Sequence, residues 1–581
     1  MTTPAQDGMP TTRGTNLFRA DPNLAFVCES VMAPDVFERA RPELDAMGAV
    51  AGGELDALAA DADRNPPTLR AFDASGRRAD EVVFHPAYRE MERLAFCRFG
   101  LAAMSHREGV LGWPTRVPHV VKYALSYLFA QAEFGILCPV SVTDSTSRML
   151  RWFGSDELKA RYLPGLTSTE PAALRQGTQW MTERTGGSDV GASTTRAERG
   201  ADGTWRLHGE KWFCSNANAD MAITLARPEG APDGTRGLGM FLVPRLLPDG
   251  ARNAWTINRL KDKLGSRSMA TGEVTFAGAV AYPVGDLAHG FKQMMQMVNV
   301  SRLSNAMRAA GIMRRCVLES VVHARGRAAF GKALVDLPLM RATLMEMLLD
   351  AEAAVSVVLH AAAALDRADA GGEDDRALVR VLTPLAKCWI TYRARAVAGD
   401  AMSVRGGNGY IEEWPNGRLL RDAHLGAIWE GTSSVVALDV QRAILKDGGL
   451  DALARYAEER LATVRAPAAE PAIRQVRVAF DDLRRRADGW TALDDAAREL
   501  DARPFAEQLY HAFAASLLLA EGQRLSAARG SARKLLAAAL YTGRWLRPAG
   551  GGPVFSSAAL GWLDPLIDWT DVPERALADA R

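Results

Sequence analysis

Cysteine and histidine are scarce in this chain of 581 residues, which has 6 cysteines and 9 histidines. No two cysteines form a CxxC pair, and no histidine stands at a spacing suited to zinc. A disulfide framework and a zinc site are therefore excluded as organising features of the fold. We expect reduced structural thiols in a cytoplasmic protein, at Cys28, Cys97, Cys138, Cys214, Cys316 and Cys388.

Neither sign of charge prevails, and long apolar runs are also missing. The formal net charge is +1, so the chain as a whole carries no electrostatic signal for nucleic acid or for a membrane surface. No uninterrupted apolar stretch reaches the length that spans a bilayer. The segment from Met1 to Phe18 is polar and lacks the basic-then-apolar order of a signal peptide. These absences predict a soluble protein with no membrane span.

Four regions of different periodicity follow one another along the chain. Residues 1–176 carry apolar residues mainly at helical spacing, whereas residues 177–288 consist of short alternating stretches typical of strands. Residues 289–446 return to long helical patterns, and residues 447–581 continue them. The sequence predicts an α+β protein with an N-terminal helical domain, a middle β domain, a helical bundle and an additional C-terminal helical domain.

Within the first region, apolar spacing predicts helices over residues 87–104 and 121–134. The stretch from Ala71 to Arg78 has the composition of a turn-like hydrophilic link. We therefore expect a turn there.

One stretch, from Arg405 to Thr432, concentrates features of a catalytic segment. It opens with Arg405-Gly406-Gly407-Asn408-Gly409-Tyr410, a glycine-rich bend that lets backbone approach a ligand closely. It closes with Ile428-Trp429-Glu430-Gly431-Thr432, where the indole would partly desolvate the carboxylate of Glu430 and suit it to proton transfer. Thr432 or either serine after it could cap the apolar helix that follows. By itself, Glu430 could equally be a solvated loop residue before that cap.

A second glycine-rich loop lies at the start of the β region. Gln179-Trp180-Met181-Thr182-Glu183 leads into Thr185-Gly186-Gly187-Ser188-Asp189, which offers amides and a hydroxyl to a phosphate or to electronegative ring atoms. Glycine turns beside strands are also common as purely structural features. A third segment, Gly326 to Lys332, has P-loop spacing, but Ala333 lacks the magnesium-binding hydroxyl and the segment follows a helix. Nucleotide hydrolysis is therefore rejected.

Together, these motifs resemble the active-site and flavin segments of the acyl-CoA dehydrogenases. In that family a carboxylate removes the α-proton of an acyl thioester while a flavin takes the β-hydride. The resemblance implies that Glu430 is the catalytic base, that FAD lies between the β domain and the bundle, and that Arg302 contacts the coenzyme A part of the substrate. Matched residue by residue, it implies cofactor contacts at Gln179, Met181, Thr182, Gly187, Ser188, Phe213, Ser215, Arg327, Phe330, Gly406, Gly407 and Thr432.

Three further stretches, residues 65–86, 183–199 and 259–268, are similar to the AidB-type alkylation-response branch of that family. The resemblance covers residues 15 to 446 approximately, and the region after 446 agrees only in length and helical character. It implies a homotetramer in which Arg327 and Phe330 reach the FAD of a neighbouring subunit. It also implies weak activity on short branched acyl-CoA such as isovaleryl-CoA, and electron-transfer flavoprotein or another acceptor as oxidant. Ser403 and Arg405 depart from the family pattern, which leaves the acyl chain open.

A basic cluster in the last region bears on the DNA binding that this branch implies. Acids and bases nearly cancel over residues 441–581, yet six cations gather with only Glu521 opposing them, at Arg524, Arg529, Arg533, Lys534, Arg544 and Arg547. Such a cluster is either a solvated helix face or a phosphate-binding surface. Duplex DNA stays a candidate partner, and a flavin-bearing DNA-protecting protein with vestigial dehydrogenase activity is the alternative function. A nitroalkane oxidase on the same fold is expected to carry Asp at the base position, so Glu430 argues against it.

Overall fold

The computed structural model describes residues 8–547 and 554–580. Contacts between elements divide the chain into two compact units, each assembled from segments that are separate in sequence. The first unit comprises residues 1–53, 119–132 and 305–581, and the second comprises residues 54–118 and 133–304.

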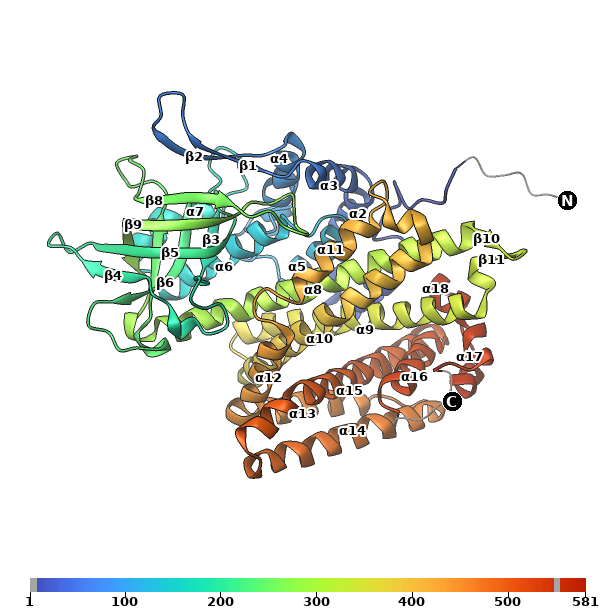
Figure 1. Cartoon of the computed structure of the whole chain (residues 1–581). Helices are drawn as coiled ribbons and strands as arrows, with labels where there is room; N and C mark the ends of the chain where they lie inside the picture. The colour runs from blue at the N-terminus through green and yellow to red at the C-terminus, as the bar shows by residue number, and fades with distance from the viewer. Residues whose placement is uncertain (1–7, 548–553, 581) are drawn as a thin grey trace. The chain divides into compact units, whose positions relative to one another are not determined.

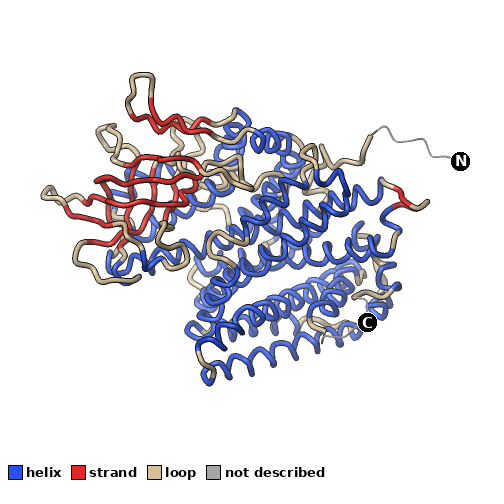
Figure 2. Tube along the Cα trace, viewed as in Figure 1, coloured by secondary structure: helices blue, strands red, loops and turns tan. Residues whose placement is uncertain are grey.

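The first unit is built of helices, apart from one short hairpin (Figures 1 and 2). Its main helices are α1 (Pro22–Val31), α2 (Pro34–Gly52), α5 (His119–Ala130), α9 (Pro338–Asp369), α10 (Glu373–Arg405), α11 (Asn416–Gly426), α12 (Ser433–Asp447), α13 (Gly449–Leu461), α14 (Glu470–Gly489), α15 (Asp495–Arg529), α16 (Arg533–Trp545), α17 (Ser557–Gly561) and α18 (Leu563–Asp568). Helix α8 (Gly290–Gly326) contributes its residues from 305 onward to this unit.

Helices α10 and α15 are the centre of this unit. Helix α10 packs against α9, α11, α12 and α13, while α15 packs against α9, α12, α13, α14 and α16. Aromatic rings join these layers: Trp389 of α10 lies 4.8 Å from His511 of α15 and 5.6 Å from Trp545 of α16, measured between ring centroids. The helices after residue 447 therefore share one core with the bundle that precedes them.

Helix α9 is long and apolar enough to cross a membrane, with a mean hydropathy of 1.6 over its most apolar window. In the structure, 94% of that window is buried inside the protein. A buried core helix passes the same test of length and composition, and α9 has the contacts of such a helix.

The second unit holds the larger sheet, whose strands gather in one place in Figure 2. Its elements are α3 (Glu54–Arg64), β1 (Thr68–Phe72), β2 (Arg78–Val83), α4 (Pro86–Glu92), α6 (Leu137–Phe153), α7 (Asp156–Leu166), β3 (Gly177–Trp180), β4 (Arg196–Arg199), β5 (Trp205–Ser215), β6 (Met221–Pro228), β7 (Gly239–Pro244), β8 (Trp255–Leu260) and β9 (Thr271–Pro283). The pairings β6–β4, β4–β5, β5–β9, β9–β7 and β7–β6 close a barrel, to which β3 and β8 add at the edges.

Strand β3 is placed by its parallel pairing with β6, in which Gln179 lies opposite Ile223. Tryptophans fill the barrel beside it, since Trp180 and Trp255 are fully buried with ring centroids 4.8 Å apart. This core fixes the end of β3, and with it the start of the glycine-rich loop.

The turn expected within residues 71–78 is present, and one of the two expected helices is shorter than predicted. Residues 68–83 form the antiparallel hairpin β1–β2, in which Asp73 closes the turn by accepting hydrogen bonds from the amides of Ser75 and Arg77. The helix expected over 87–104 is shorter, because α4 passes into a π-helical turn at Arg93–Arg98 and ends there. The helix expected over 121–134 is present as α5, and the predicted α+β class is confirmed.

Candidate active site

Glu430 lies in a tight turn between α11 and α12, in the first unit. Its φ angle is 58° and that of Gly431 is 97°, so two consecutive residues adopt left-handed backbone. Glycine takes that conformation freely, whereas a side chain such as that of Glu430 takes it at a cost of about 1–3 kcal/mol. Strain of this kind persists only where the surroundings impose it, and it concentrates at functional sites.

The surroundings of Glu430 impose the turn from both sides. The guanidinium of Arg308 lies over the ring of Trp429, 4.7 Å from its centroid. The fully buried ammonium of Lys387 donates to the carbonyl oxygen of Gly431, and the thiol of Cys388 lies 3.4 Å from the carbonyl oxygen of Ser433. Thr432 is the N-cap residue of α12, but its hydroxyl makes no capping bond. The hydroxyl of Thr432 is exposed and available to a ligand.

The glycine-rich bend after α10 presents bare backbone. Gly406 has a φ of 66°, and nothing lies within 4 Å of the position that a Cβ would take at Gly406 or Gly407. At Gly409 the same position would lie 2.3 Å from the carbonyl oxygen of Met402, so a side chain is excluded there. The bend therefore has backbone that a ligand can approach closely at Gly406 and Gly407. Close packing at Gly409 fixes its shape.

Arg405, which departs from the family pattern, has a structural explanation. Its side chain is buried and pairs with the carboxylate of Glu319, which also accepts from Arg315 and from the hydroxyl of Thr12. The charge of Arg405 is thus committed to the core of the first unit.

Phe330 stands at the tip of the hairpin formed by β10 (Ala328–Ala329) and β11 (Lys332–Ala333). Phe330 and Gly331 have φ angles of 53° and 78°, which gives the tight turn that two-residue hairpins prefer. The Phe330 side chain is 93% exposed, and Arg327 beside it is also exposed. The hairpin tip therefore presents the ring of Phe330 and the side chain of Arg327 to solvent.

In the second unit, the residues predicted to follow the flavin ring are fixed by hydrogen bonds between β3 and β5. The carbonyl oxygen of Ser215 accepts from the hydroxyl of Thr178 at 2.7 Å and from the indole of Trp180 at 2.9 Å. The amide of Trp212 donates to the carbonyl oxygen of Thr182 at 2.9 Å. Gln179, Thr182 and Ser215 are therefore held on adjacent strand ends.

The loop after β3 ends in exposed backbone at Gly187 and Ser188. Among the described residues, neither of these two amides donates a hydrogen bond, so both can serve a ligand. Phe213 of β5 is 57% exposed, and Met181 is half-buried against the core of the unit. Exposed amides beside an exposed ring suit a ligand that has both phosphate and aromatic parts.

Sequence reasoning gave no role to Glu183 and Lys211, which anchor this loop. The carboxylate of Glu183 accepts from Lys211 at 2.6 Å, from the hydroxyl of Thr195 at 2.6 Å and from the amide of Thr194 at 2.6 Å. Burial opposes ionisation of Glu183, but Lys211 and these donors outweigh it and hold the pKa of Glu183 below its usual value. Burial lowers the pKa of Lys211 more than Glu183 raises it. The pair is 28 residues apart in sequence, and no spacing rule could have found it.

Arg302 lies on the part of α8 that belongs to the second unit, and its side chain is only 4% exposed. Its assignment as a coenzyme A contact stays a prediction.

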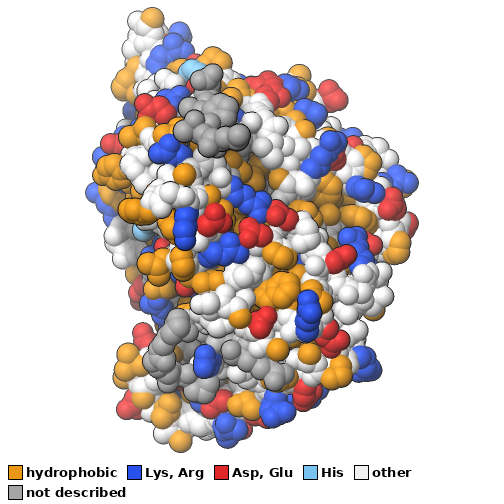
Figure 3. All heavy atoms as spheres, turned by 90° about the vertical axis from the view of Figure 1, so that its right-hand side faces the viewer, with side chains coloured by type: hydrophobic (Ala, Val, Ile, Leu, Met, Phe, Trp, Pro, Cys, Tyr) orange, Lys and Arg blue, Asp and Glu red, His pale blue; other side chains and the backbone are white. Residues whose placement is uncertain are grey.

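The six predicted DNA contacts do not form one exposed cluster. Arg533 pairs with Glu352 and Lys534 lies 2.7 Å from Glu521, both in buried pairs, and Arg544 lies 2.7 Å from the partly exposed Glu346. Arg524, Arg529 and Arg547 are exposed. Figure 3 shows acidic and basic side chains interspersed on the face that it presents. The interpretation of all six as one solvated or DNA-binding face is wrong, because α9 and α15 supply acidic partners to three of them.

Three family models match the chain. The "Adaptive response protein AidB N-terminal domain" covers residues 8–170, the "Acyl-CoA dehydrogenase, middle domain" covers 178–279, and the "Acyl-CoA dehydrogenase, C-terminal domain" covers 288–445. AidB of Escherichia coli K12 is 37% identical over 398 residues, which are 66% of this chain and 70% of that protein. The chain belongs to the acyl-CoA dehydrogenase family.

Solved structures of other acyl-CoA dehydrogenases extend the likeness. Caenorhabditis elegans ACDH-11, solved in complex with C11-CoA, is 27% identical with a TM-score of 0.87, and the match covers 95% of this chain and 94% of that one. The match therefore includes most of the helices after residue 447. An acyl-CoA dehydrogenase of Bacillus anthracis complexed with FAD has a TM-score of 0.67 at 18% identity, covering 97% and 90% of the two chains, and shares the fold.

This acyl-CoA dehydrogenase is an oxidoreductase, and its cofactor is FAD. The donor set fits that cofactor in each unit. In the second unit, the amides of Gly187 and Ser188 and the ring of Phe213 are exposed. The first unit offers open backbone at Gly406 and Gly407 and a hydroxyl of Thr432 that makes no capping bond. Donors of this kind bind phosphate and ribityl oxygens.

Proposed function

We propose that this acyl-CoA dehydrogenase oxidises a short or branched acyl-CoA of the isovaleryl-CoA kind, with Glu430 as the base. The observation that carries the role of Glu430 is its left-handed backbone, held by Lys387 and by the packing of Arg308 on Trp429. A carboxylate fixed in a strained turn keeps its position when substrate binds, which is what proton abstraction from a weakly acidic carbon requires.

The reaction removes two hydrogens from the bond between Cα and Cβ of the acyl group. Glu430 takes the Cα hydrogen as a proton, and the electron pair left at Cα forms the double bond to Cβ. FAD, when bound, accepts the hydrogen of Cβ as a hydride. Glu430 therefore ends the step protonated, and it returns its proton to water before the next turnover.

The residues of the second unit orient the cofactor in this proposal. Gln179, Met181, Thr182, Phe213 and Ser215 lie on strand ends that the barrel core fixes, so they suit the ring. Gly187 and Ser188 offer amides to its polar edge or to phosphate. Arg302 is proposed as a contact of the coenzyme A part of the substrate.

A homotetramer is part of the proposal. It is supported by the hairpin tip, where Phe330 is strained and 93% exposed and Arg327 stands beside it. We propose that this tip reaches the FAD of a neighbouring subunit, and that electron-transfer flavoprotein or another acceptor reoxidises the enzyme. A cytoplasmic location agrees with the six free thiols, which all lie among the described residues.

The test is an anaerobic titration of the FAD-loaded protein, followed by visible absorbance. The panel runs from isovaleryl-CoA and butyryl-CoA to undecanoyl-CoA, because the C. elegans neighbour was solved with C11-CoA. Bleaching by the short thioesters supports the proposal. Bleaching by undecanoyl-CoA alone would overturn the acyl class, and bleaching by none of them would overturn the dehydrogenase function.

Glu430→Gln separates the base from the binding site. This variant should keep FAD and bind acyl-CoA, yet reduce flavin at least 10³-fold more slowly. Glu413→Gln is the matched control, because Glu413 is an exposed glutamate on the same segment. Rapid reduction in Glu430→Gln would assign the base to another residue.

DNA binding has weaker support. Only three of the six predicted cations are exposed, and the interspersed charges of Figure 3 give no surface of one sign on that face. We therefore do not propose the alternative of a DNA-protecting flavoprotein as the main function.

A further inference from the structure

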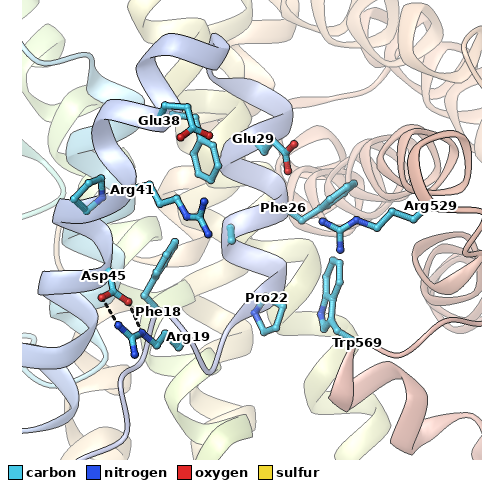
Figure 4. A pocket seen from close by; sticks show the side chains of 13 residues that line it. Phe18, Arg19, Pro22, Phe26, Glu29, Glu38, Arg41, Asp45, Arg529 and Trp569 are labelled. Carbon is cyan, nitrogen blue, oxygen red and sulfur yellow. Dashed lines mark hydrogen bonds and ion pairs between the residues drawn. The ribbon is translucent and has the colours of Figure 1, made fainter.

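A cavity of about 920 Å³ lies in the first unit, away from the catalytic segment. Helices α1 and α2, the end of α15 and the residue after α18 form its walls (Figure 4). Its volume is in the range of cavities that hold small molecules. None of the residues that line it belongs to the segment from Arg405 to Thr432. The cavity is therefore separate from the residues assigned to dehydrogenation.

The walls are aromatic. Phe18 in the turn before α1, Phe26 of α1 and Phe37 of α2 line the cavity. Trp569 lines it from the other side. The rings of Phe26 and Trp569 lie 5.6 Å apart, measured between centroids. Trp569 has a left-handed φ of 54°, and the guanidinium of Arg533 packs over its ring at 4.1 Å. The ring of Trp569 is thus fixed in the wall at a cost in backbone strain.

Two cations face this apolar space. Figure 4 shows the guanidinium groups of Arg41 and Arg529 reaching into the cavity from opposite sides. Among the described residues, neither has a carboxylate within ion-pair distance, and both side chains are exposed to solvent. Two cations that line one apolar cavity without an ion pair favour a ligand that has an anionic group.

Among the described residues, the acids of the lining make no ion pair with these two arginines, although the charge of Arg41 helps to lower the pKa of Asp45. Asp45 accepts from Arg19 at 2.7 and 2.8 Å, and this pairing is the main cause of its lowered pKa. Glu29 and Glu38 lie together at one end of the cavity in Figure 4. A cationic head group would be repelled by both arginines. A ligand with one anionic end and an apolar body meets complementary groups along its length.

We propose that this cavity binds an amphiphile with one anionic head group, a carboxylate or a phosphate monoester. The head lies between Arg41 and Arg529, where guanidinium forks match the oxygen geometry of both groups. The apolar body lies against Phe26, Phe18 and Trp569, which removes its surface from water. This site goes beyond the dehydrogenase reaction and does not depend on it.

The test is calorimetric titration of the FAD-loaded full chain with four ligands of one chain length: octanoate, octyl phosphate, octyltrimethylammonium and octanol. Both anions should bind at one site per chain, and octanol and the cation should bind at least tenfold more weakly. A preference of tenfold or more between octanoate and octyl phosphate identifies the fatty acid or the phosphate ester as the ligand class. Equal binding of all four ligands would overturn the proposal, since it would show a merely apolar site.

Matched variants place the ligand in this cavity rather than in an acyl pocket. Arg529→Gln and Arg41→Gln should each weaken anion binding at least tenfold, with acyl-CoA oxidation unchanged. Arg474→Gln is the control, because Arg474 is an exposed arginine on α14 outside the cavity. Anion binding that is unaffected in Arg529→Gln and Arg41→Gln would overturn the site. Failure of the anions to bind, with a change of oligomeric state in Arg529→Gln, would overturn it in favour of an interface between copies of the chain.

Discussion

The ammonium of Lys387 donates a hydrogen bond to the carbonyl oxygen of Gly431, the residue directly after the proposed base. Lys387 is fully buried on α10, 44 residues before its acceptor. The bond links the central helix of the first unit to the turn that holds Glu430. We infer that Lys387 positions the base by fixing the backbone behind it.

Lys387→Met tests this link. The variant keeps most of the side-chain volume but leaves the carbonyl of Gly431 without its ammonium donor. We expect kcat to fall about tenfold or more while KM and FAD content stay the same, because a displaced base affects only the chemical step. Lys446→Met is the control, since Lys446 is exposed on the neighbouring helix α12. A variant that loses thermal stability with no change in kcat would show that the bond is only structural.

Glu183→Gln tests the buried pair that anchors the loop after β3. Removing one partner of a buried pair typically costs about 3–5 kcal/mol, and here it leaves Lys211 without its counter-ion. We expect a large loss in the free energy of unfolding and weaker FAD binding. The control is Glu210→Gln, whose carboxylate pairs with Arg184 at the surface and should matter by less than about 1 kcal/mol.

The same pair has a pH dependence of known sign. The folded state holds the pKa of Glu183 below its unfolded value, so its contribution is present above the ordinary glutamate range, about pH 4, and is lost as the pH falls further. The stability difference between the wild type and Glu183→Gln should therefore shrink in acid. A difference that grows below pH 4 would contradict the assignment.

His323 gives a second pH dependence, in the range where histidine titrates. Burial, assisted by the charges of Arg405 and Arg327, lowers the pKa of His323 to about 4. Between pH 6.5 and 4 the unfolded chain therefore takes up a proton that the folded chain does not, and the free energy of unfolding falls by about 3 kcal/mol on acidification. His323→Leu should remove this slope from denaturant titrations measured across that range. His208→Leu, at a partly exposed position on β5, should keep it.

Phe330→Asn tests the hairpin tip. Asparagine tolerates left-handed backbone better than phenylalanine, so the variant should not destabilise the isolated subunit. If Phe330 contacts a neighbouring subunit, sedimentation should show dissociation of the oligomer, and FAD affinity should fall at least tenfold. Leu339→Asn is the control, because Leu339 is 85% exposed but lies at the start of α9. Equal behaviour of the two variants would remove the special role of Phe330.

The sequence predicted well those backbone features that short local motifs encode. One stretch contains the glycine bend, the Trp429-Glu430-Gly431 segment and the start of the helix at Thr432. The residue types of this stretch indicate its local backbone conformation. The turn at Asp73 shows the limit of this approach. Its polar composition predicted the turn but not the hairpin around it, because the strands on either side are short and become regular only by pairing with each other.

Long-range pairs were beyond prediction for a physical reason. A charge is solvated or buried according to what the fold brings against it, and the sequence around Arg533 and Lys534 contains little of that information. Their acidic partner Glu352 lies 181 residues before Arg533. The arginine and lysine of α16 therefore looked like a basic surface, although α9 neutralises them.

Arg533→Met tests whether this buried network holds the C-terminal helices to the bundle. Arg533 donates to Glu352 at 3.0 Å, and Lys534 lies 3.5 Å from the same carboxylate. Burial opposes ionisation of Glu352, but these two cations outweigh it and lower its pKa. Loss of Arg533 leaves Glu352 with one cation in the core, and a cost of about 3–5 kcal/mol follows. We expect a marked fall in melting temperature, whereas Arg474→Met on the exposed face of α14 should change it little.

Because α15 and α16 share the core of α9 and α10, the loss should appear as one cooperative transition. A separate early transition of the helices after residue 447 would instead show that they fold as an independent domain.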